Sequence, residues 1–326
     1  TSALQIALKI TGVKKNDEVI IPTLTFIAPV YAIKYIGASP VFMDVDIYHN
    51  LDIAKTIDYI KNNTEFKNGY SYNKNTKKRI SAIVIVHVWG NAVNIYSLIS
   101  ICKNTNIKIV EDASESLGTW YKKGKNKFHT GTLGFIGCLS FNGNKIITTG
   151  GGGMILTNNA KHAKKAEYLI NQAKDDSVFF KHDNIGYNYR LTNLQAALGI
   201  PQIKKIKKIL NKKKIINNLY KKELLNLSKV KIYKNPKYSL NNNWINIVEF
   251  KGRVNIKKII DHFEKNKIQV RPIWKLNHTQ KQFKKCETYK IENAKKIIKN
   301  SLCLPSSYNL NKKDILRIVK CFKDII

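Results

Sequence analysis

The sequence predicts an α/β fold, with a mostly parallel sheet covered by helices on both faces and a smaller α+β domain after it. Three observations support this prediction. Short apolar runs, typical of strands buried on both faces, alternate with helical segments over the first two hundred residues. The 326 residues suffice for two domains, and the apolar fraction of 43% is that of a globular protein. Near residue 200 the alternation ends and a long lysine-rich helix begins.

The first part of the chain is a succession of strands and helices. A helix is predicted to begin at Thr1 and Ser2, which are good caps and whose free N–H groups could also bind a phosphate. The runs that predict strands are VIIP (19–22), VFMDVD (41–46), AIVIVHV (82–88), IKIV (107–110) and MILT (154–157). Further helices are predicted at 23–36 after a loop, 51–63, 95–103 and 160–172, and a polar insertion at 64–79.

A domain boundary is predicted at residues 199–201, which gives a large domain of residues 1–200 and a small domain of residues 201–326. Just before it, GYNYRLT (186–192) is predicted to be irregular and NLQAALG (193–199) helical. The small domain is predicted to contain an amphipathic helix over 203–219 with a solvated basic face, the strand INIVEF (245–250), a helix near 257–266, and ordered loops at RPIWKLNH (271–278) and CLPSSYNL (303–310).

The net charge of +35 is compatible with nucleic-acid binding. However, lysine, isoleucine, asparagine and tyrosine are all enriched along the whole chain, as AT-biased coding would produce, and the basic residues are not gathered with aromatic residues in one patch. We therefore expect no specific nucleic-acid partner, although an anionic substrate would be attracted to such a surface. A basic nucleic-acid-binding or regulatory protein remains the alternative from a different functional class.

The sequence gives no sign of a membrane span or of a signal peptide, which predicts a cytoplasmic protein without membrane association. The five cysteines are scattered, odd in number and without a CxxC pair. This pattern predicts reduced thiols and no metal site.

Lys145 is the first candidate for a chemical role. It lies between a short apolar run, residues 139–141, and four consecutive glycines at 150–153. A covalent site needs such a lysine beside backbone that can approach a ligand closely, although a surface lysine on a loop is the simpler interpretation. Two phosphate-binding motifs are excluded, because the lysine follows Asn144 instead of glycine, and the glycines at 131, 134 and 137 do not have the dinucleotide spacing.

Asp112 is the second candidate. It follows the buried run IKIV in the segment VEDASES (110–116), and in parallel sheets ligands bind at the carboxyl ends of the strands. Taken alone, Asp112 could equally be a helix cap or a loop carboxylate.

Several segments, in order, resemble the DegT-type sugar aminotransferases, which are pyridoxal-phosphate enzymes of the aspartate-aminotransferase fold. The matching segments cover nearly the whole chain: TSAL, DEVIIPTLTF, GASPVFMDVD, VHVWGN, IVEDASESLG, SFNGNKIITTGGGG, GYNYRLTNLQAALG, RPIWK and LPSS. The segments EDASES and SFNGNKIITTGGGG are most similar to the branch that acts on nucleotide-linked 4-keto-6-deoxy sugars, as in legionaminic-acid-type or perosamine pathways.

The resemblance implies a three-layer αβα large domain and assigns roles to two residues. Lys145 would be the Schiff-base lysine, and Asp112 would hold the proton on the pyridinium nitrogen, so that the cofactor can act as an electron sink. A lysine amine near cationic and apolar groups would lose proton affinity and become nucleophilic. Once freed, the amine could move the proton between substrate and cofactor.

The resemblance also implies how the cofactor is held. Thr1, Ser2 and the Ser140 hydroxyl would bind the phosphate, and Asn188 would reach in from the neighbouring subunit of a homodimer. Phe26 matches the aromatic residue stacked on the cofactor ring, with plain core packing as the alternative. Glu115 lies where many relatives carry Gln or His facing the phenolic oxygen, and its carboxylate is a departure from that pattern.

On the substrate side, Arg271 and His278 match a loop near the nucleotide sugar, and both residues could equally be structural. The expected reaction transfers an amino group, with L-glutamate as donor, to a keto sugar on a nucleotide carrier. A sugar dehydratase of the same fold is the nearest alternative, but such enzymes replace the lysine with histidine, which Lys145 argues against. A catalytically inactive truncation product is a further alternative.

The resemblance carries one expectation about the start of the chain. In relatives, a glycine and a longer N-terminal portion precede the pair equivalent to Thr1 and Ser2. We therefore expect that this chain lacks an N-terminal segment, and that phosphate binding by the first helical turn is weakened as a result.

Overall fold

The computed structural model describes residues 1–176, 178–252 and 254–325. Its centre is a sheet with the strand order β10-β9-β6-β5-β1-β2-β15. The strands of this path are β1 (Glu18–Pro22), β2 (Ser39–Met43), β5 (Arg79–Val86), β6 (Lys108–Asp112), β9 (Ile136–Ser140), β10 (Gly153–Leu156) and β15 (Thr288–Tyr289). All neighbouring pairs on it are parallel except β9 and β10. The predicted mostly parallel sheet is thus confirmed.

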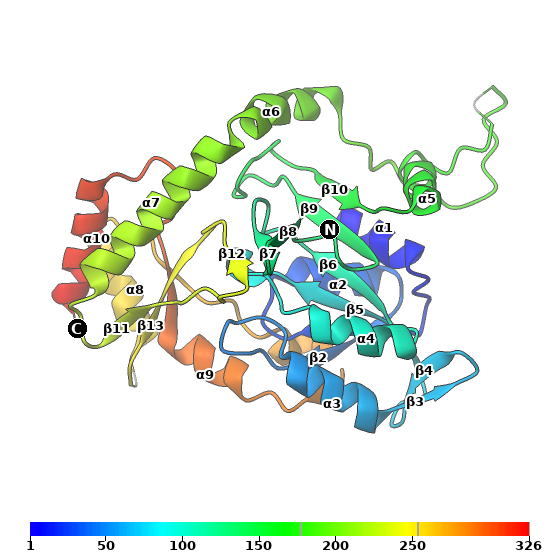
Figure 1. The fold of residues 1–326 in the computed structure, drawn as a ribbon, viewed down its shortest axis with the longest axis horizontal. Coiled ribbons are helices and arrows are strands. Elements are labelled where there is room, and N and C mark those ends of the chain that lie inside the picture. Colours follow the sequence, from blue (N-terminus) through cyan, green and yellow to red (C-terminus); the bar gives the residue numbers. More distant parts are fainter. Residues whose placement is uncertain (177, 253, 326) are drawn as a thin grey trace.

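Helices cover both faces of this sheet (Figure 1) because the strand side chains alternate between two apolar layers. On β1, Val19 and Ile21 face the layer that contains α1 (Ser2–Ile10) and α2 (Ile27–Tyr35). Ile20 faces the opposite layer, which contains α3 (Ile53–Asn63) and α4 (Tyr96–Asn104). Strand β10 leads into α5 (Ala160–Ile170). The three-layer arrangement places the carboxyl ends of β6 and β9 side by side.

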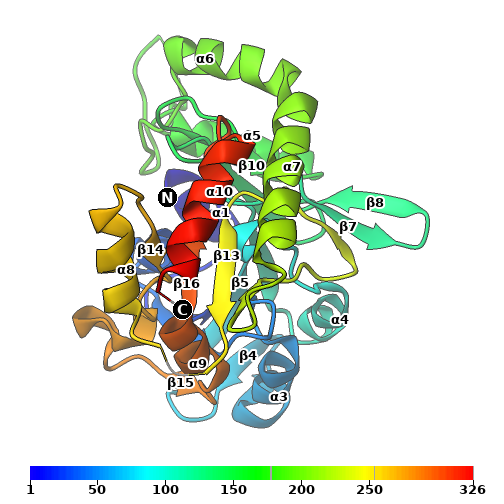
Figure 2. The same cartoon turned by 90° about the vertical axis from the view of Figure 1, so that its left-hand side faces the viewer.

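The C-terminal part has its own hydrophobic core. A four-stranded sheet of order β11-β13-β16-β14 packs against α7, α8 and α10 (Figure 2). The elements of this part are α6 (Asn193–Lys204), α7 (Ile206–Leu224), β11 (Val230–Ile232), β13 (Asn246–Phe250), α8 (Ile256–Lys265), β14 (Arg271–Pro272), α9 (Asn293–Asn300), β16 (Ser301–Leu304) and α10 (Lys312–Lys323). Short 3₁₀ turns lie at Val88–Gly90, Asn277–Thr279 and Lys281–Phe283.

The predicted boundary at residue 200 falls within a helix. α6 runs through Pro201 and ends at Lys204, and the chain then turns at Lys205 into α7. Two later segments pair with strands of the N-terminal part. β15 pairs with β2. β12 (Ser239–Leu240) pairs with β7 (Trp120–Lys123), which forms a hairpin with β8 (Asn126–His129). The division into residues 1–200 and 201–326 therefore stays a prediction.

Three local predictions differ from the structure. The polar insertion at 64–79 contains a hairpin of β3 (Thr64–Lys67) and β4 (Tyr70–Asn73), which pairs with the start of β5. The segments 271–278 and 303–310 are not wholly loops, because Arg271 and Pro272 form strand β14, and Cys303 and Leu304 end strand β16. One lysine of the basic helix is buried instead of solvated. Lys213 is 7% exposed, and its Nζ donates to the Trp244 carbonyl at 2.9 Å.

Within the described part of the chain, the helices fall short of the length and apolar character that crossing a membrane requires.

Candidate active site

A cavity of about 1680 Å³ opens at the carboxyl ends of β6 and β9. It brings together segments that are far apart in the sequence, from the first helix to β16. Nine of the residues predicted for the site line it: Thr1, Ser2, Phe26, Asp112, Glu115, Ser140, Lys145, Asn188 and Arg271. His278 is not among its lining residues. This is the edge at which parallel sheets bind their ligands.

Lys145 lies on the loop that joins β9 to β10. Its backbone N–H donates to the Asn142 carbonyl at 3.0 Å, which fixes a tight turn. Its side chain is 12% exposed, and Nζ lies 3.9 Å from a carboxylate oxygen of Glu115 and 4.2 Å from the centre of the Trp244 ring. In these two contacts the amine meets an acid and an aromatic face, both of which attract a positive charge, instead of the expected cationic groups.

The glycines at 150–153 allow the backbone beside Lys145 to pack closely. Gly152 has φ +119°, and its carbonyl accepts from the Phe141 N–H at 3.0 Å. A Cβ on Gly152 would lie 2.6 Å from Leu191, and one on Gly153 would lie 2.9 Å from the Leu139 carbonyl oxygen. A side chain at position 153 would push β10 away from β9, and the positive φ at position 152 favours glycine there.

Asp112 ends β6 and is 3% exposed. One carboxylate oxygen accepts from the Ser114 N–H at 3.0 Å. The residue pairs across the sheet with Val86 and Cys138, so its backbone is held on both sides. A fixed carboxylate that faces a cavity is suited to binding a protonated ring nitrogen.

Glu115 is buried between Lys145 and the turn at Trp89. Its second oxygen accepts from the Trp89 N–H at 2.8 Å. Burial raises the pKa of this carboxyl from its ordinary 4.5 to about 7, while the Lys145 charge and the Trp89 hydrogen bond lower it and Asp112 raises it further. Glu115 can therefore exchange a proton near neutral pH, which a Gln at this position could not.

The residues predicted to bind the phosphate also line the cavity. Thr1 is the N-cap of α1 but its side chain makes no capping hydrogen bond, and Thr1 and Ser2 are both exposed. The Ser140 hydroxyl makes one long contact, accepting from the Asn142 N–H at 3.4 Å. Asn188 is exposed and forms a backbone bridge with Asn171. Hydroxyls and N–H groups at a helix start form an anion-binding arrangement.

An aromatic wall of three residues, Phe26, Trp274 and Trp89, borders the cavity. The ring centroids of Trp274 and Trp89 are 4.1 Å apart, and those of Trp274 and Phe26 are 5.8 Å apart. Phe26 is 52% exposed, so core packing does not account for it. Trp89 has φ 60°, a rare conformation for a bulky residue, which turns its backbone N–H toward Glu115.

No role was predicted from the sequence for Trp89, Trp274 or Trp244. Trp244 is 4% exposed, and besides its contact with Lys145 its indole N–H donates to the Asn144 carbonyl at 2.7 Å. It thus links the loop of Lys145 to the start of β13. For Trp89 and Trp274 one sequence signal was available, because they lie in the matching segments VHVWGN and RPIWK.

The two residues predicted for the substrate side lie in different places. Arg271 on β14 is exposed and also lines a neighbouring cavity of about 630 Å³ beside Lys213 and Arg317. His278 instead contacts Thr23, with Nδ1 2.6 Å from the hydroxyl oxygen, and packs near the Phe42 ring. Burial and the charge of Lys295 lower the pKa of His278. This placement favours a structural role for His278.

Comparison with known proteins accounts for this combination of fold and site. The model of the DegT/DnrJ/EryC1/StrS aminotransferase family matches residues 1–323. The chain belongs to this family. It is therefore an aminotransferase, and pyridoxal phosphate is its cofactor. The groups on this one cavity fit the parts of that cofactor. The lysine fits its amine-reactive group, the buried carboxylate and the aromatic wall fit its ring, and the helix start fits its phosphate.

Relatives of this aminotransferase are similar over nearly all of its length. EpsN of Bacillus subtilis, named as a pyridoxal phosphate-dependent aminotransferase, is 32% identical over 98% of this chain and 80% of its own. GDP-perosamine synthase of Escherichia coli O157:H7 is 31% identical over 99% of this chain and 83% of its own.

Solved structures share the fold. A DegT DnrJ EryC1 StrS aminotransferase from Brucella abortus has a TM-score of 0.88 at 22% identity, covering 99% of this chain and 83% of that one. Helicobacter pylori PseC, an aminotransferase of pseudoaminic acid biosynthesis, has a TM-score of 0.85 at 21% identity, covering 99% and 84%. The predicted aspartate-aminotransferase-like fold and family are thus confirmed.

Within the described residues, no group of three or more histidine, cysteine or acidic side chains is arranged to hold a metal ion.

Proposed function

We propose that this aminotransferase transfers an amino group from an amino acid, L-glutamate, to the keto carbon of a nucleotide-linked deoxy sugar for glycan biosynthesis. The observation that carries this proposal is the convergence of Lys145 and Asp112 on one large cavity of a chain that belongs to the family. The relatives' names support the substrate class, since they include GDP-perosamine synthase and a UDP-amino-sugar transaminase of Campylobacter jejuni.

Bound pyridoxal phosphate supplies an aldehyde that bonds to amines and a ring that accepts electrons from the neighbouring carbon. Lys145 offers the amine that holds this aldehyde and, when free, the base that moves a proton. Asp112 offers the negative charge that keeps the ring nitrogen protonated. Its burial strengthens that interaction, because few water molecules compete for it.

Glu115 lies next to the amine and is proposed to face the phenolic oxygen of the ring. With its pKa raised to about 7 by burial, the carboxyl can be protonated at neutral pH, and it then donates a hydrogen bond instead of repelling an anionic oxygen. The aromatic wall is proposed to hold one face of the ring, with Phe26 in the stacking position. Thr1, Ser2 and Ser140 are proposed to bind the phosphate.

A second copy of the chain is proposed to complete the site. α6 has no buried residue, although it carries Leu194 at 82% and Leu198 at 58% exposure. The segment before it exposes Phe179 and Ile185, both above 80%. Such an apolar surface favours a homodimer. Asn188 lies between these segments, which supports the proposal that it serves the partner's cofactor. The chain is proposed to act in the cytoplasm.

The proposed reaction is tested by incubating the purified protein with pyridoxal phosphate, L-glutamate and a panel of nucleotide-linked 4-keto-6-deoxy sugars. Formation of 2-oxoglutarate together with an aminated nucleotide sugar is the expected result, and Lys145→Ala should form neither. Turnover of glutamate with simple keto acids, but with no nucleotide sugar of the panel, would overturn the proposed substrate class.

A further inference from the structure

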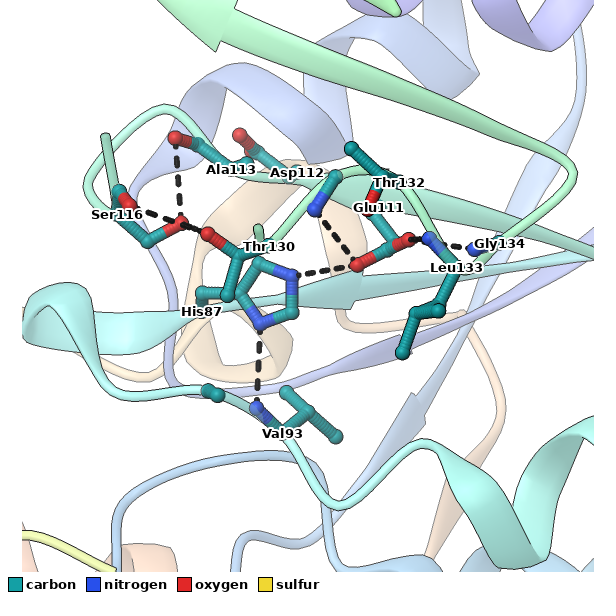
Figure 3. A network of polar contacts seen from close by, with 12 residues as sticks. His87, Val93, Glu111, Asp112, Ala113, Ser116, Thr130, Thr132, Leu133 and Gly134 are labelled. Atoms are coloured by element: carbon teal, nitrogen blue, oxygen red, sulfur yellow. Dashed lines mark hydrogen bonds and ion pairs between the residues drawn. The ribbon is translucent and has the colours of Figure 1, made fainter. Parts of the chain in front are cut away.

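The residue beside Asp112 is a completely buried carboxylate, Glu111, which does not line the cavity. Five donors surround it. His87 Nε2 and the Tyr121 hydroxyl each lie 3.0 Å from Oε2, which also accepts from the Gly131 N–H at 2.8 Å. The other oxygen accepts from the N–H groups of Leu133, at 2.7 Å, and Gly134. Figure 3 shows the carboxylate between the His87 ring and this loop.

The donors are arranged for an ionised carboxylate. The Val93 N–H donates to Nδ1 of His87 at 3.1 Å, so the ring proton lies on Nε2 and points to Glu111. Burial alone would raise the pKa of Glu111, but the hydrogen bonds from His87 and the loop N–H groups outweigh it and lower the pKa. An internal anion bound by backbone N–H groups has few other conformations available.

The glycines at 131, 134 and 137 make this binding loop possible. Gly131 has φ +91°, and a Cβ on Gly134 would lie 2.9 Å from the Ile109 carbonyl oxygen and 3.0 Å from Glu111 Cγ. A Cβ on Gly137 would lie 2.0 Å from the Gly131 carbonyl oxygen. These glycines do not bind a dinucleotide; they let the loop close around the side chain of Glu111.

The loop leads directly into β9, which carries Ser140 and continues to Lys145. In the register of the two strands, Glu111 pairs with Gly137 and Asp112 with Cys138. Successive side chains of a strand point to opposite faces of the sheet. Asp112 faces the cavity, and Glu111 therefore makes its contacts on the opposite face. The contacts of Glu111 therefore fix β6 relative to the strand that leads to the catalytic lysine.

We infer that Glu111 is a positioning residue: bound by the 131–134 loop, His87 and Tyr121, it sets the placement of Asp112 relative to Lys145. The inference rests on the proposed function, because the two positioned groups act on the cofactor and substrate. Misplacement of reacting groups by about 1 Å can reduce a rate by up to 100-fold. Loss of one of the five donors should shift the pair less, and reduce kcat by about tenfold.

The decisive variant is Tyr121→Phe, which removes one donor and leaves the charge and the ring. Its matched control is Tyr59→Phe, because Tyr59 is also fully buried and its hydroxyl accepts from Asn73 at 3.0 Å near Glu18, at the amino end of β1. The two variants should lose similar stability. Only Tyr121→Phe should lower kcat, with the KM for L-glutamate unchanged, and weaken pyridoxal phosphate binding.

A second pair of variants, Glu111→Gln and Glu18→Gln, tests the loop directly. An amide has one acceptor oxygen, so Glu111→Gln leaves at least two of the donors unpaired. Hydrogen exchange of the amides at 131, 133 and 134 should become at least about tenfold faster in this variant and stay unchanged in Glu18→Gln.

Failure of the inference is distinguishable from failure of the proposed function. If the wild-type protein aminates a nucleotide sugar, but Tyr121→Phe and Tyr59→Phe have the same kcat and KM, the inference alone is overturned. Equal amide exchange in Glu111→Gln and Glu18→Gln would overturn it too. If the wild-type protein does not bind pyridoxal phosphate, the proposed function and the inference both fail. Should Glu111→Gln not fold, the tyrosine pair decides.

Discussion

Two carboxylates near Lys145 are placed in opposite electrostatic situations. Asp112 and Glu115 both line the cavity and each accepts from one backbone N–H, but Glu115 in addition lies 3.9 Å from the lysine amine. Environments that differ in this way allow two acids to take different roles at one pH. Burial raises the pKa of Glu115 to about 7, so this carboxyl can hold a proton near neutrality.

Asp112→Asn should reduce kcat by at least about 100-fold, because a neutral amide cannot keep the ring nitrogen protonated in the charged transition state. Stability should change little. Asp17→Asn is the matched control, since Asp17 is buried and accepts from Arg79 Nε at 3.0 Å, away from the cavity. That variant should unfold at lower urea concentration and keep its kcat. Steady-state kinetics and urea titrations decide, and a folded Asp112→Asn with near-normal kcat would return Asp112 to a structural role.

Glu115→Gln should change the pH dependence of stability. The folded state holds a proton with a pKa of about 7 that the unfolded state releases near 4.5, so the contribution of Glu115 to stability falls as pH rises through this window. The glutamine variant has no charge to bury. Relative to wild type, it should therefore gain about 2 kcal/mol of unfolding free energy between pH 5 and pH 8.

Urea unfolding of the cofactor-free protein at both pH values measures this gain. The control is Glu65→Gln, whose parent side chain is 56% exposed. Its stability difference from wild type should not change between the two pH values. An equal pH response in the two variants would show that Glu115 is not protonated near neutral pH.

At the scale of elements, much of the fold could be predicted because its signals are local. The runs VIIP, AIVIVHV and IKIV became β1, β5 and β6 with small shifts of their ends. The hairpin at 64–73 could not be predicted, because its strands are polar and are stabilised by pairing of β4 with the start of β5. Likewise, Lys213 is held by the Trp244 carbonyl, a partner 31 residues away that helical periodicity cannot reveal.

The site shows the same division. Lys145 and Asp112 could be proposed because sequence-adjacent glycines and a buried strand mark them. Trp244 follows no local pattern, and only the packing of the C-terminal part against the large sheet brings it to the cavity. Glu111 was equally hidden, since its donors come from the residue after β5, from β7 and from the loop before β9.

The unburied helix α6 gives a prediction about assembly. Leu194→Asp should weaken the proposed dimer, because it places a charge in an apolar interface, and the population of monomer at micromolar concentration should rise. Leu225→Asp is the matched control, since Leu225 is 81% exposed, compared with 82% for Leu194, and lies beyond α7. Light scattering after size exclusion measures both masses. A monomeric wild-type protein, or equal behaviour of the two variants, would contradict the dimer.

At the scale of the whole molecule, the charge of +35 should produce only non-specific attraction to nucleic acid. Any binding to DNA should come from counterion release. The logarithm of the affinity should therefore fall linearly with the logarithm of the salt concentration, and the affinity should not depend on the DNA sequence. Fluorescence anisotropy with two unrelated duplexes between 50 and roughly 300 mM salt tests this. A tight complex that prefers one duplex at physiological salt would favour a regulatory function instead.

The account as a whole depends on one covalent position among the chain's many lysines. The protein is mixed with pyridoxal phosphate, reduced with borohydride, digested and mapped by mass spectrometry, with Lys145→Ala treated in parallel. We predict a reduced pyridoxyl group on Lys145 at near-stoichiometric yield, with loss of the visible absorbance band on reduction, and no such band in the variant. A group absent from Lys145, or spread evenly over surface lysines in both proteins, would contradict the assignment of this site.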